Sequence, residues 1–269
     1  MWVAPKRDWT PFDLPYLIGW NSNRHLQGFS VTDNAVSNWE DSSQNGNDLL
    51  SPADSGGATQ RPDIATSSNF GGKKVAVFDA TDDKSMILDP PPDALEFGLG
   101  DFLFASAFQF AASGTPILCS AQRQSNSNEI KLSLTALGTP QLKLGNGGTV
   151  TGDSSVFGST TLLVATRVSG TISLFINGVS TGTPLSGTTI AIGGDGALRL
   201  GCINLGSKGV SGHATGEIAE FIYGGSGSTG VITDFDRQRL EGYLAHEVGI
   251  SSVLPTTHPY KYGPPKKAT

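Results

Sequence analysis

The segment from Leu162 to Gly178 constrains the fold more than any other part of the chain. It reads LLVATRV, then Ser169-Gly170, then TISLFING, so two runs of strand-forming residues flank a two-residue connection. Glycine readily adopts the positive φ that a tight hairpin turn needs, and this pattern predicts two antiparallel strands. The chain therefore contains a β-hairpin against which further strands can pair.

The turn also predicts the register of this hairpin. Pairing Val168 with Thr171 sorts the side chains into two faces, because successive strand residues point to opposite sides. The first face is apolar and holds Leu163, Ala165, Ile172, Leu174 and Ile176. The second face is mixed and holds Val164, Thr166, Ser173 and Phe175. We expect the first face in the core of a sandwich, and the second on an outer surface that is only partly covered.

Other segments repeat the strand pattern at short intervals. A strand is predicted around Val75 and Val77, and a loop from Leu50 to Gly72 is expected to precede it. Later strands are predicted at Asp101–Phe110, Thr115–Gln122, Glu129–Ala136, Gln141–Gly145, Thr149–Val150, Thr188–Ile192, Ala197–Leu205 and Gly216–Tyr223. With 35 glycines, 15 prolines and 16% charged residues, this spacing is typical of an antiparallel β-sandwich.

One helix is predicted, over residues 234–248. Thr233 and Asp236 have the spacing of a capping box, and an apolar stripe follows at Leu240, Tyr243, Leu244 and Val248. Gly249 is placed to end the helix in a left-handed conformation. We therefore divide the chain into an extended aromatic arm (residues 1–19), a β-sandwich domain that includes the helix (residues 20–254), and a proline-rich tail (residues 255–269).

Charge and hydropathy exclude two classes of partner. The formal net charge is −6, which gives no electrostatic basis for binding a nucleic-acid backbone. No stretch approaches the roughly 20 apolar residues of a membrane-spanning helix. The first residues, MWVAPKRDWTPFD, lack the apolar run of a cleaved signal peptide, so we expect synthesis in a bacterial cytoplasm.

Two interpretations of the aromatic arm stay open. Trp2, Trp9 and Phe12 are candidates for binding a partner protein, because exposed aromatic side chains anchor interfaces. The alternative is that the arm folds back and covers the core of the same chain. The cysteines, Cys119 and Cys202, lie in apolar strands, where we expect buried reduced thiols rather than a disulfide.

Three segments together resemble a known family. AVSNWEDSSQNGND, with RPDI and VAVFDATDD, resembles the opening of concanavalin A-like, laminin-G-like jelly-roll domains, and LLVATRVSGTISLFINGV resembles their central hairpin. GEIAEFIYGG and the later DFDRQRLEGYLAHEVGISSVLPTTHPYKYGPP resemble the last strand, helix and tail of such domains in bacteriophage virion proteins and bacterial surface proteins. The resemblance covers about Leu14 to Pro265 and implies an all-β, two-sheet jelly roll used for binding and adhesion.

The resemblance implies a non-enzymatic structural protein of the phage virion, as a capsid decoration or a tail appendage. Its partners would be other virion proteins, contacted through the arm, and host surface carbohydrate, and symmetric homo-oligomers such as a trimer are compatible with that role. The alternative function is a carbohydrate-binding lectin. A sugar site needs an exposed aromatic platform beside amides, and Trp39 with Asn45 and Asn47 is the candidate. The alternative for Trp39 is a position in the core, and the sequence favours neither role.

A glycanase is the third function considered, because some jelly rolls of this kind use two close carboxylates. The nearest pair is Glu217 and Glu220, and on a regular strand residues three apart point to opposite faces. We therefore assign no catalytic residue.

No cofactor is expected, although calcium is an alternative. Two groups of oxygen ligands could hold it, one of Asp79, Asp82 and Asp83 and the other of Asp41, Asn45, Asn47 and Asp48. Asp and Asn also serve turns by bonding the backbone. The histidines, His25, His213, His246 and His258, are scattered and indicate neither a metal triad nor a catalytic triad.

Overall fold

The predicted hairpin is present, near one end of the hydrogen-bonded strand order. In the computed structural model, β12 (Thr161–Val168) and β13 (Thr171–Ile176) pair antiparallel with Val168 opposite Thr171. Ser169 and Gly170 have φ values of 49° and 78°, as the tight turn requires. The structure describes residues 8–28, 35–51, 60–88, 97–98, 100–111, 114–122, 129–145, 147–187, 197–204, 210–226 and 231–267.

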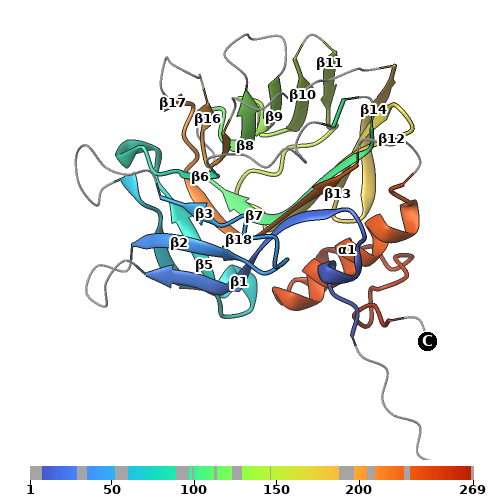
Figure 1. Cartoon of the computed structure of the whole chain (residues 1–269), viewed down its shortest axis with the longest axis horizontal. Helices are drawn as coiled ribbons and strands as arrows, with labels where there is room; N and C mark the ends of the chain where they lie inside the picture. Colours follow the sequence, from blue (N-terminus) through green and yellow to red (C-terminus); the bar gives the residue numbers. More distant parts are fainter. Residues whose placement is uncertain are drawn as a thin grey trace, which may run out of the picture.

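The strands form an antiparallel jelly-roll sandwich (Figure 1). Their hydrogen-bonded order is β11-β10-β9-β8-β15-β6-β3-β2-β1-β18-β7-β12-β13-β14, with β5 added to β18 and β4 to β5. The path folds over, so that its two ends, β11 and β14, come into contact. The bounds of the other strands are β1 (Leu17–Gly28), β2 (Val36–Asp41), β3 (Leu49–Leu50), β4 (Asp63–Ser67), β5 (Lys73–Phe78), β6 (Met86–Leu88), β7 (Phe102–Phe110), β8 (Ile117–Gln122), β9 (Glu129–Leu134), β10 (Pro140–Leu144), β11 (Gly148–Thr151), β14 (Val179–Ser186), β15 (Leu198–Leu200) and β18 (Gly216–Gly225). A separate hairpin joins β16 (Ile203–Asn204) to β17 (Val210–Ser211).

The apolar face of the hairpin points into the sandwich, as predicted. Leu163, Ala165, Ile172 and Leu174 are buried in the inner core cluster, which also contains Phe104, Phe108, Phe221 and Trp39. Ile176, the fifth residue predicted on this face, is partly buried against the cluster. Burial of this cluster supplies most of the driving force for folding. Cys119 and Cys202 are both free and buried, which confirms the expectation of reduced thiols.

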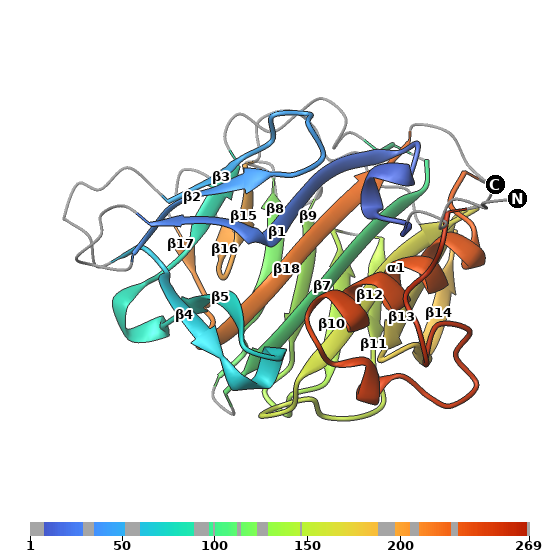
Figure 2. The same cartoon turned by 90° about the horizontal axis from the view of Figure 1, so that it is seen from below.

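A second apolar cluster lies outside the sandwich, under the helix. Figure 2 shows helix α1 (Asp234–Glu247) lying across the outer face of β7 and β12. Thr233 Oγ1 accepts a hydrogen bond from the Asp236 amide and the Asp236 carboxylate accepts one from the Thr233 amide, which confirms the capping box. The predicted stripe, Leu240, Tyr243, Leu244 and Val248, is buried against the strands, and Gly249 has a φ of 74°.

Several elements differ from the sequence expectation. The expected loop from Leu50 to Gly72 contains β4, and β1, β2 and β14 were not predicted as strands. The predicted strand at Thr188–Ile192 lies outside the described residues. A β-bulge at Ala219 also interrupts β18, because Ile218 pairs with Phe108 while Glu220 pairs with Ala107.

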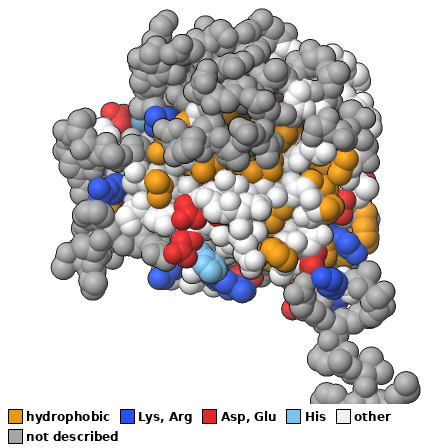
Figure 3. Space-filling model, viewed as in Figure 1, with side chains coloured by type: hydrophobic (Ala, Val, Ile, Leu, Met, Phe, Trp, Pro, Cys, Tyr) orange, Lys and Arg blue, Asp and Glu red, His pale blue; other side chains and the backbone are white. Residues whose placement is uncertain are grey.

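Within the described ranges, no helix has the length and apolar character needed to cross a membrane. On the face shown in Figure 3, acidic and basic side chains lie close to one another along the lower edge.

Candidate functional site

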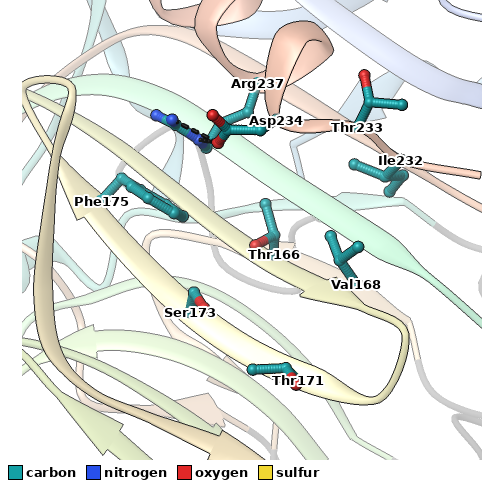
Figure 4. Close-up of a pocket in the computed structure, with 9 residues that line it drawn as sticks. All are labelled: Thr166, Val168, Thr171, Ser173, Phe175, Ile232, Thr233, Asp234 and Arg237. Carbon is teal, nitrogen blue, oxygen red and sulfur yellow. Dashed lines mark hydrogen bonds and ion pairs between the residues drawn. The ribbon is translucent and has the colours of Figure 1, made fainter. Parts of the chain in front are cut away.

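Helix α1 leaves part of the outer face of the hairpin uncovered, and a pocket of about 210 Å³ lies there. Figure 4 shows strand residues on one side and residues at the start of α1 on the other. The pocket is lined by Thr166, Val168, Thr171, Ser173, Phe175, Ile232, Thr233, Asp234 and Arg237. The mixed face of the hairpin therefore forms one wall of a pocket, and the helix forms the other.

Two hydroxyl groups lie on the strand wall, one on Thr166, which is 3% exposed, and one on the partly exposed Ser173. Thr166 of β12 and Ser173 of β13 are directly paired, so their side chains lie next to each other on the same face. No hydrogen bond joins either hydroxyl to another group in the part of the chain that the structure describes. Each hydroxyl can donate one hydrogen bond and accept others.

The helix wall carries a fixed charge cluster. The Arg237 guanidinium carbon lies 3.9 Å from the centre of the Phe175 ring, within the range of a cation–π contact. Arg237 Nε donates to Asp234 Oδ1 over 2.7 Å, and Nη1 donates to Glu241 Oε2 over 2.6 Å. His258 Nε2 lies 3.1 Å from the same Glu241 oxygen. These contacts hold the guanidinium flat against the ring.

Asp101 holds the two walls together. Its buried carboxylate accepts hydrogen bonds from the Ser169 amide (2.8 Å) in the hairpin turn and from the Val231 amide (2.9 Å) before the helix. The Ile232 amide lies 3.4 Å from the same Oδ2 atom. The carboxylate thus fixes the distance between the turn and the start of α1, and with it the width of the pocket.

The predicted sugar platform is not present at Trp39. The Trp39 side chain is 0% exposed, and its Nε1 donates to the Ser22 carbonyl oxygen over 2.7 Å. A sugar stacks on an exposed ring face, so Trp39 has the other role considered, that of a core residue. Asn45 Nδ2 and Asn47 Nδ2 donate to the Ile18 carbonyl oxygen over 3.0 and 2.7 Å, so both amides brace the turn after β2.

The described part of the arm folds back onto the chain. Trp9 is only 2% exposed and packs edge-on against Tyr243 of α1, with ring centres 6.4 Å apart. Phe12 is 49% exposed, and Trp2 lies outside the described residues. Of the three predicted partner-binding residues, Phe12 alone is shown with a large accessible surface.

The bulge in β18 corrects the expectation for Glu217 and Glu220. Glu217 pairs with Gln109 and Glu220 with Ala107, so both point to the outer face rather than to opposite faces. Their partners differ, however. Glu217 accepts hydrogen bonds from Ser67 and Asn69, whereas Glu220 accepts them from Trp20 Nε1 and Ser22 Oγ.

Burial changes the acidity of Glu220. Desolvation raises the pKa of this carboxyl to about 8, the negative charge of Glu247 adds to the rise, and the hydrogen bonds from Trp20 and Ser22 oppose it. The side chain is 0% exposed, and it is absent from the lining of the pocket on the hairpin.

Three of the acidic side chains predicted as calcium ligands, Asp41, Asp48 and Asp79, accept backbone hydrogen bonds, and Asp82 and Asp83 lie in ion pairs with Lys84 and His213. Asp41 accepts hydrogen bonds from the amides of Trp20, Ser43 and Asn47, and Asp79 accepts one from the Thr81 amide. That bond and the one from the Thr81 hydroxyl lower the pKa of Asp79. Across the described segments, no three His, Cys, Asp or Glu side chains form a group that could hold a metal ion.

Two other hollows lie on the described part of the chain. A groove of about 430 Å³ between the β11–β12 connection and the β13–β14 turn is rich in hydroxyls but has no aromatic ring in its lining. A pocket of about 260 Å³ contains Trp20 and Tyr243. Its Arg24 is already paired with Glu247 through two hydrogen bonds of 2.8 and 2.6 Å.

Similarity to one solved domain supports the β-sandwich fold, and two other solved structures align less closely. Domain 4 of an extracellular arabinanase from Geobacillus stearothermophilus, solved with arabinotriose, aligns with a TM-score of 0.51 and 18% identity over 78% of this chain and 93% of that domain. The carbohydrate-binding module of a Ruminococcus gnavus sialidase, solved with α2,6-sialyllactose, aligns at 0.44 and 16% over 58% of this chain and 86% of that one. A Streptococcus pneumoniae sialidase aligns at 0.47 and 15% over 61% of this chain, which spans about a quarter (26%) of the enzyme.

At these identities the likeness concerns the β-sandwich fold alone. No protein-family model matches the chain, and no curated protein matches it.

Proposed function

We propose that this chain is a carbohydrate-binding β-sandwich that catalyses no reaction, and that its sugar site is the pocket on the outer face of the β12–β13 hairpin. The observation that carries the proposal is the meeting of three kinds of group in that pocket. The hydroxyls of Thr166 and Ser173 have no partner among the described residues, Phe175 offers an aromatic ring, and Asp234 offers an exposed carboxylate.

Sugars present hydroxyl groups that both donate and accept hydrogen bonds, together with patches of C–H surface. Serine and threonine hydroxyls match the first property because they also donate and accept, and a carboxylate accepts strongly. An aromatic ring matches the second property. The likeness to the arabinanase domain that was solved with arabinotriose is consistent with this proposal, since the two share a fold.

The pocket size sets the expected footprint and affinity. A volume of about 210 Å³ corresponds to roughly seven water molecules, enough for one sugar ring rather than an oligosaccharide. A monosaccharide of about 12 heavy atoms at about 0.3 kcal/mol per atom gives about −4 kcal/mol, or a Kd near 1 mM. Useful affinity for a glycan surface would then come from several copies acting together.

A glycan array followed by titration tests the proposal. We expect binding that the double variant Thr166→Val with Ser173→Ala weakens about tenfold, because each lost hydrogen bond costs roughly 0.5–1.5 kcal/mol. The matched control is Ser155→Ala with Ser180→Ala, which removes two hydroxyls from the larger groove. Absence of binding to every glycan, or an equal loss in both double variants, would contradict the proposed site.

A second proposal concerns where the chain works. The resemblance to bacteriophage virion proteins, with Phe12 half-exposed on the arm, supports a capsid decoration or tail appendage that contacts other virion proteins. Mass spectrometry of purified particles tests this role. Absence of the chain from the particles removes the virion role and leaves the sugar proposal standing.

A further inference from the structure

The charge arrangement at the pocket on the hairpin bears on which sugars it accepts. Arg237 is the cation that lines the pocket, and its side chain is 8% exposed. Each of its three nitrogens already faces a carboxylate oxygen. Nε and Nη2 lie 2.7 and 2.6 Å from Asp234 Oδ1, and Nη1 lies 2.6 Å from Glu241 Oε2.

A sugar carboxylate is recognised best by a guanidinium that offers two parallel N–H groups. In this pocket the N–H groups of Arg237 already donate to Asp234 on one side and Glu241 on the other. The flat face of the guanidinium is turned to Phe175. The exposed charge at the pocket is therefore the Asp234 carboxylate, whose side chain is 68% exposed. An anionic ligand would meet a like charge there without a free partner.

The positive amino end of helix α1 does not offset the negative charge at the pocket. The amino end of a helix is electropositive and favours anions. In α1 this end already carries Asp234 and Asp236 in its first turn, and the Asp236 amide is bonded to Thr233 Oγ1. The chain thus supplies its own anions at the position where an external one would bind.

Building on the proposed function, we infer that the pocket selects uncharged sugars and rejects acidic ones, with Asp234 as the residue that sets this preference. The groups left for the ligand are the Thr166 and Ser173 hydroxyls, the part of the Phe175 ring that Arg237 does not cover, and the exposed Asp234 carboxylate. Asp234 Oδ2 accepts a hydrogen bond from Gln238 Nε2 over 3.0 Å, and the carboxylate can accept further ones from sugar hydroxyls. All of these suit a neutral pyranose or furanose, and none of them suits a uronic or sialic acid.

Matched pairs of sugars test the inference. Methyl glucoside, galactoside and mannoside are titrated beside the corresponding uronides, which differ only in a carboxylate at carbon 6. We expect at least one neutral glycoside to bind at least tenfold more tightly than its uronide. Asp234→Asn removes the repelling charge and frees N–H donors of Arg237. We therefore expect the ratio of the affinity for the neutral glycoside to that for its uronide to fall to about threefold or less.

Asp82→Asn is the control, because Asp82 is a half-exposed carboxylate in an ion pair with Lys84 on a different part of the surface. It removes the same charge and is expected to leave the ratio unchanged. A uronide that binds wild-type protein as well as its neutral partner would overturn the inference and leave sugar binding intact. An unchanged ratio in Asp234→Asn, or an equal fall in Asp82→Asn, would overturn the role of Asp234. Failure of both sugar classes to bind would overturn the proposed function and the inference with it.

Discussion

The guanidinium group of Arg237 packs against the Phe175 ring, with 3.9 Å between the guanidinium carbon and the ring centre. This contact joins helix α1 to β13 across the open end of the pocket. It places an aromatic ring, a buried ion-pair cluster and two strand hydroxyls around one small volume. The candidate site thus depends on two segments about 60 residues apart in the sequence, Phe175 in the hairpin and Arg237 in the helix.

Phe175→Ala is expected to reduce both stability and sugar binding. The ring is partly buried and contacts Arg237, so its loss should lower the free energy of unfolding by about 2 kcal/mol. Phe157→Ala is the control, because Phe157 is also partly buried but packs against the inner core. Chemical denaturation should show both variants destabilised, and titration should show weaker sugar binding in Phe175→Ala alone. Equal binding by the two variants would exclude Phe175 from the site.

Asp101→Asn is expected to destabilise the fold and distort the pocket. An amide nitrogen in place of one carboxylate oxygen would face backbone N–H donors, and an unmatched buried donor costs about 1–3 kcal/mol. Asp153→Asn serves for comparison, because Asp153 is exposed and also accepts a backbone hydrogen bond, from Gly182 over 2.7 Å. Thermal unfolding should show a clearly larger loss for Asp101→Asn. Similar losses would mean that Asp101 does not brace the walls.

Glu220 gives stability a defined pH dependence. Its pKa is raised to about 8 in the folded state, while an unfolded glutamate titrates near 4.3. Between these values the folded state binds a proton that the unfolded state has lost, so stability falls as pH rises through this window. The slope approaches about 1.4 kcal/mol per pH unit for one proton.

Glu220→Gln mimics the protonated form and should remove this part of the slope. Denaturation measured from pH 5 to pH 9 checks the prediction, with Glu217→Gln as the control on the same strand. If wild type and Glu220→Gln lose stability equally over this range, Glu220 is ionised in the folded protein.

The two thiols are expected to be unreactive in the native state. Burial raises the pKa of Cys202 to about 11 and raises that of Cys119 further, so neither forms a thiolate readily near neutral pH. A thiol-reactive disulfide reagent at pH 8 should react with neither cysteine of folded protein and with both after unfolding in guanidinium chloride. Rapid labelling of the folded chain would show that a thiol is accessible.

The sequence predicted the inner part of the fold well, because inner strands follow simple alternation. The strands Phe102–Phe110 and Thr161–Val168 are buried along almost their whole length, so their apolar character is clear in the sequence. By contrast, β1 was not predicted because Asn21, Ser22 and Asn23 occupy its middle and are buried. Hydrogen bonds such as that from Asn21 Nδ2 to the Trp39 carbonyl oxygen make this burial tolerable, and composition does not reveal them.

The candidate site was only half predictable. The predicted register of the hairpin placed Thr166, Ser173 and Phe175 on one mixed face, and the structure confirms that register. No site was predicted there, and only the structure shows that this face lines a pocket. The other wall depends on how α1 packs across the strands, which helical periodicity alone does not fix. Trp39 was a candidate sugar platform because its neighbours in the sequence are polar, but its ring is buried in the core.

Amide chemical-shift mapping by NMR shows directly whether sugars bind in the pocket between the hairpin and helix α1. Isotope-labelled chain is titrated with the neutral methyl glycoside that binds best, under saturating conditions appropriate to a millimolar Kd. We expect the largest shifts on Thr166, Ser173, Phe175 and Asp234, on both walls of the one pocket. Largest shifts at the groove around Asp153 and Ser180 or at the turn of Asn45 and Asn47, or no shifts with any sugar, would contradict this expectation.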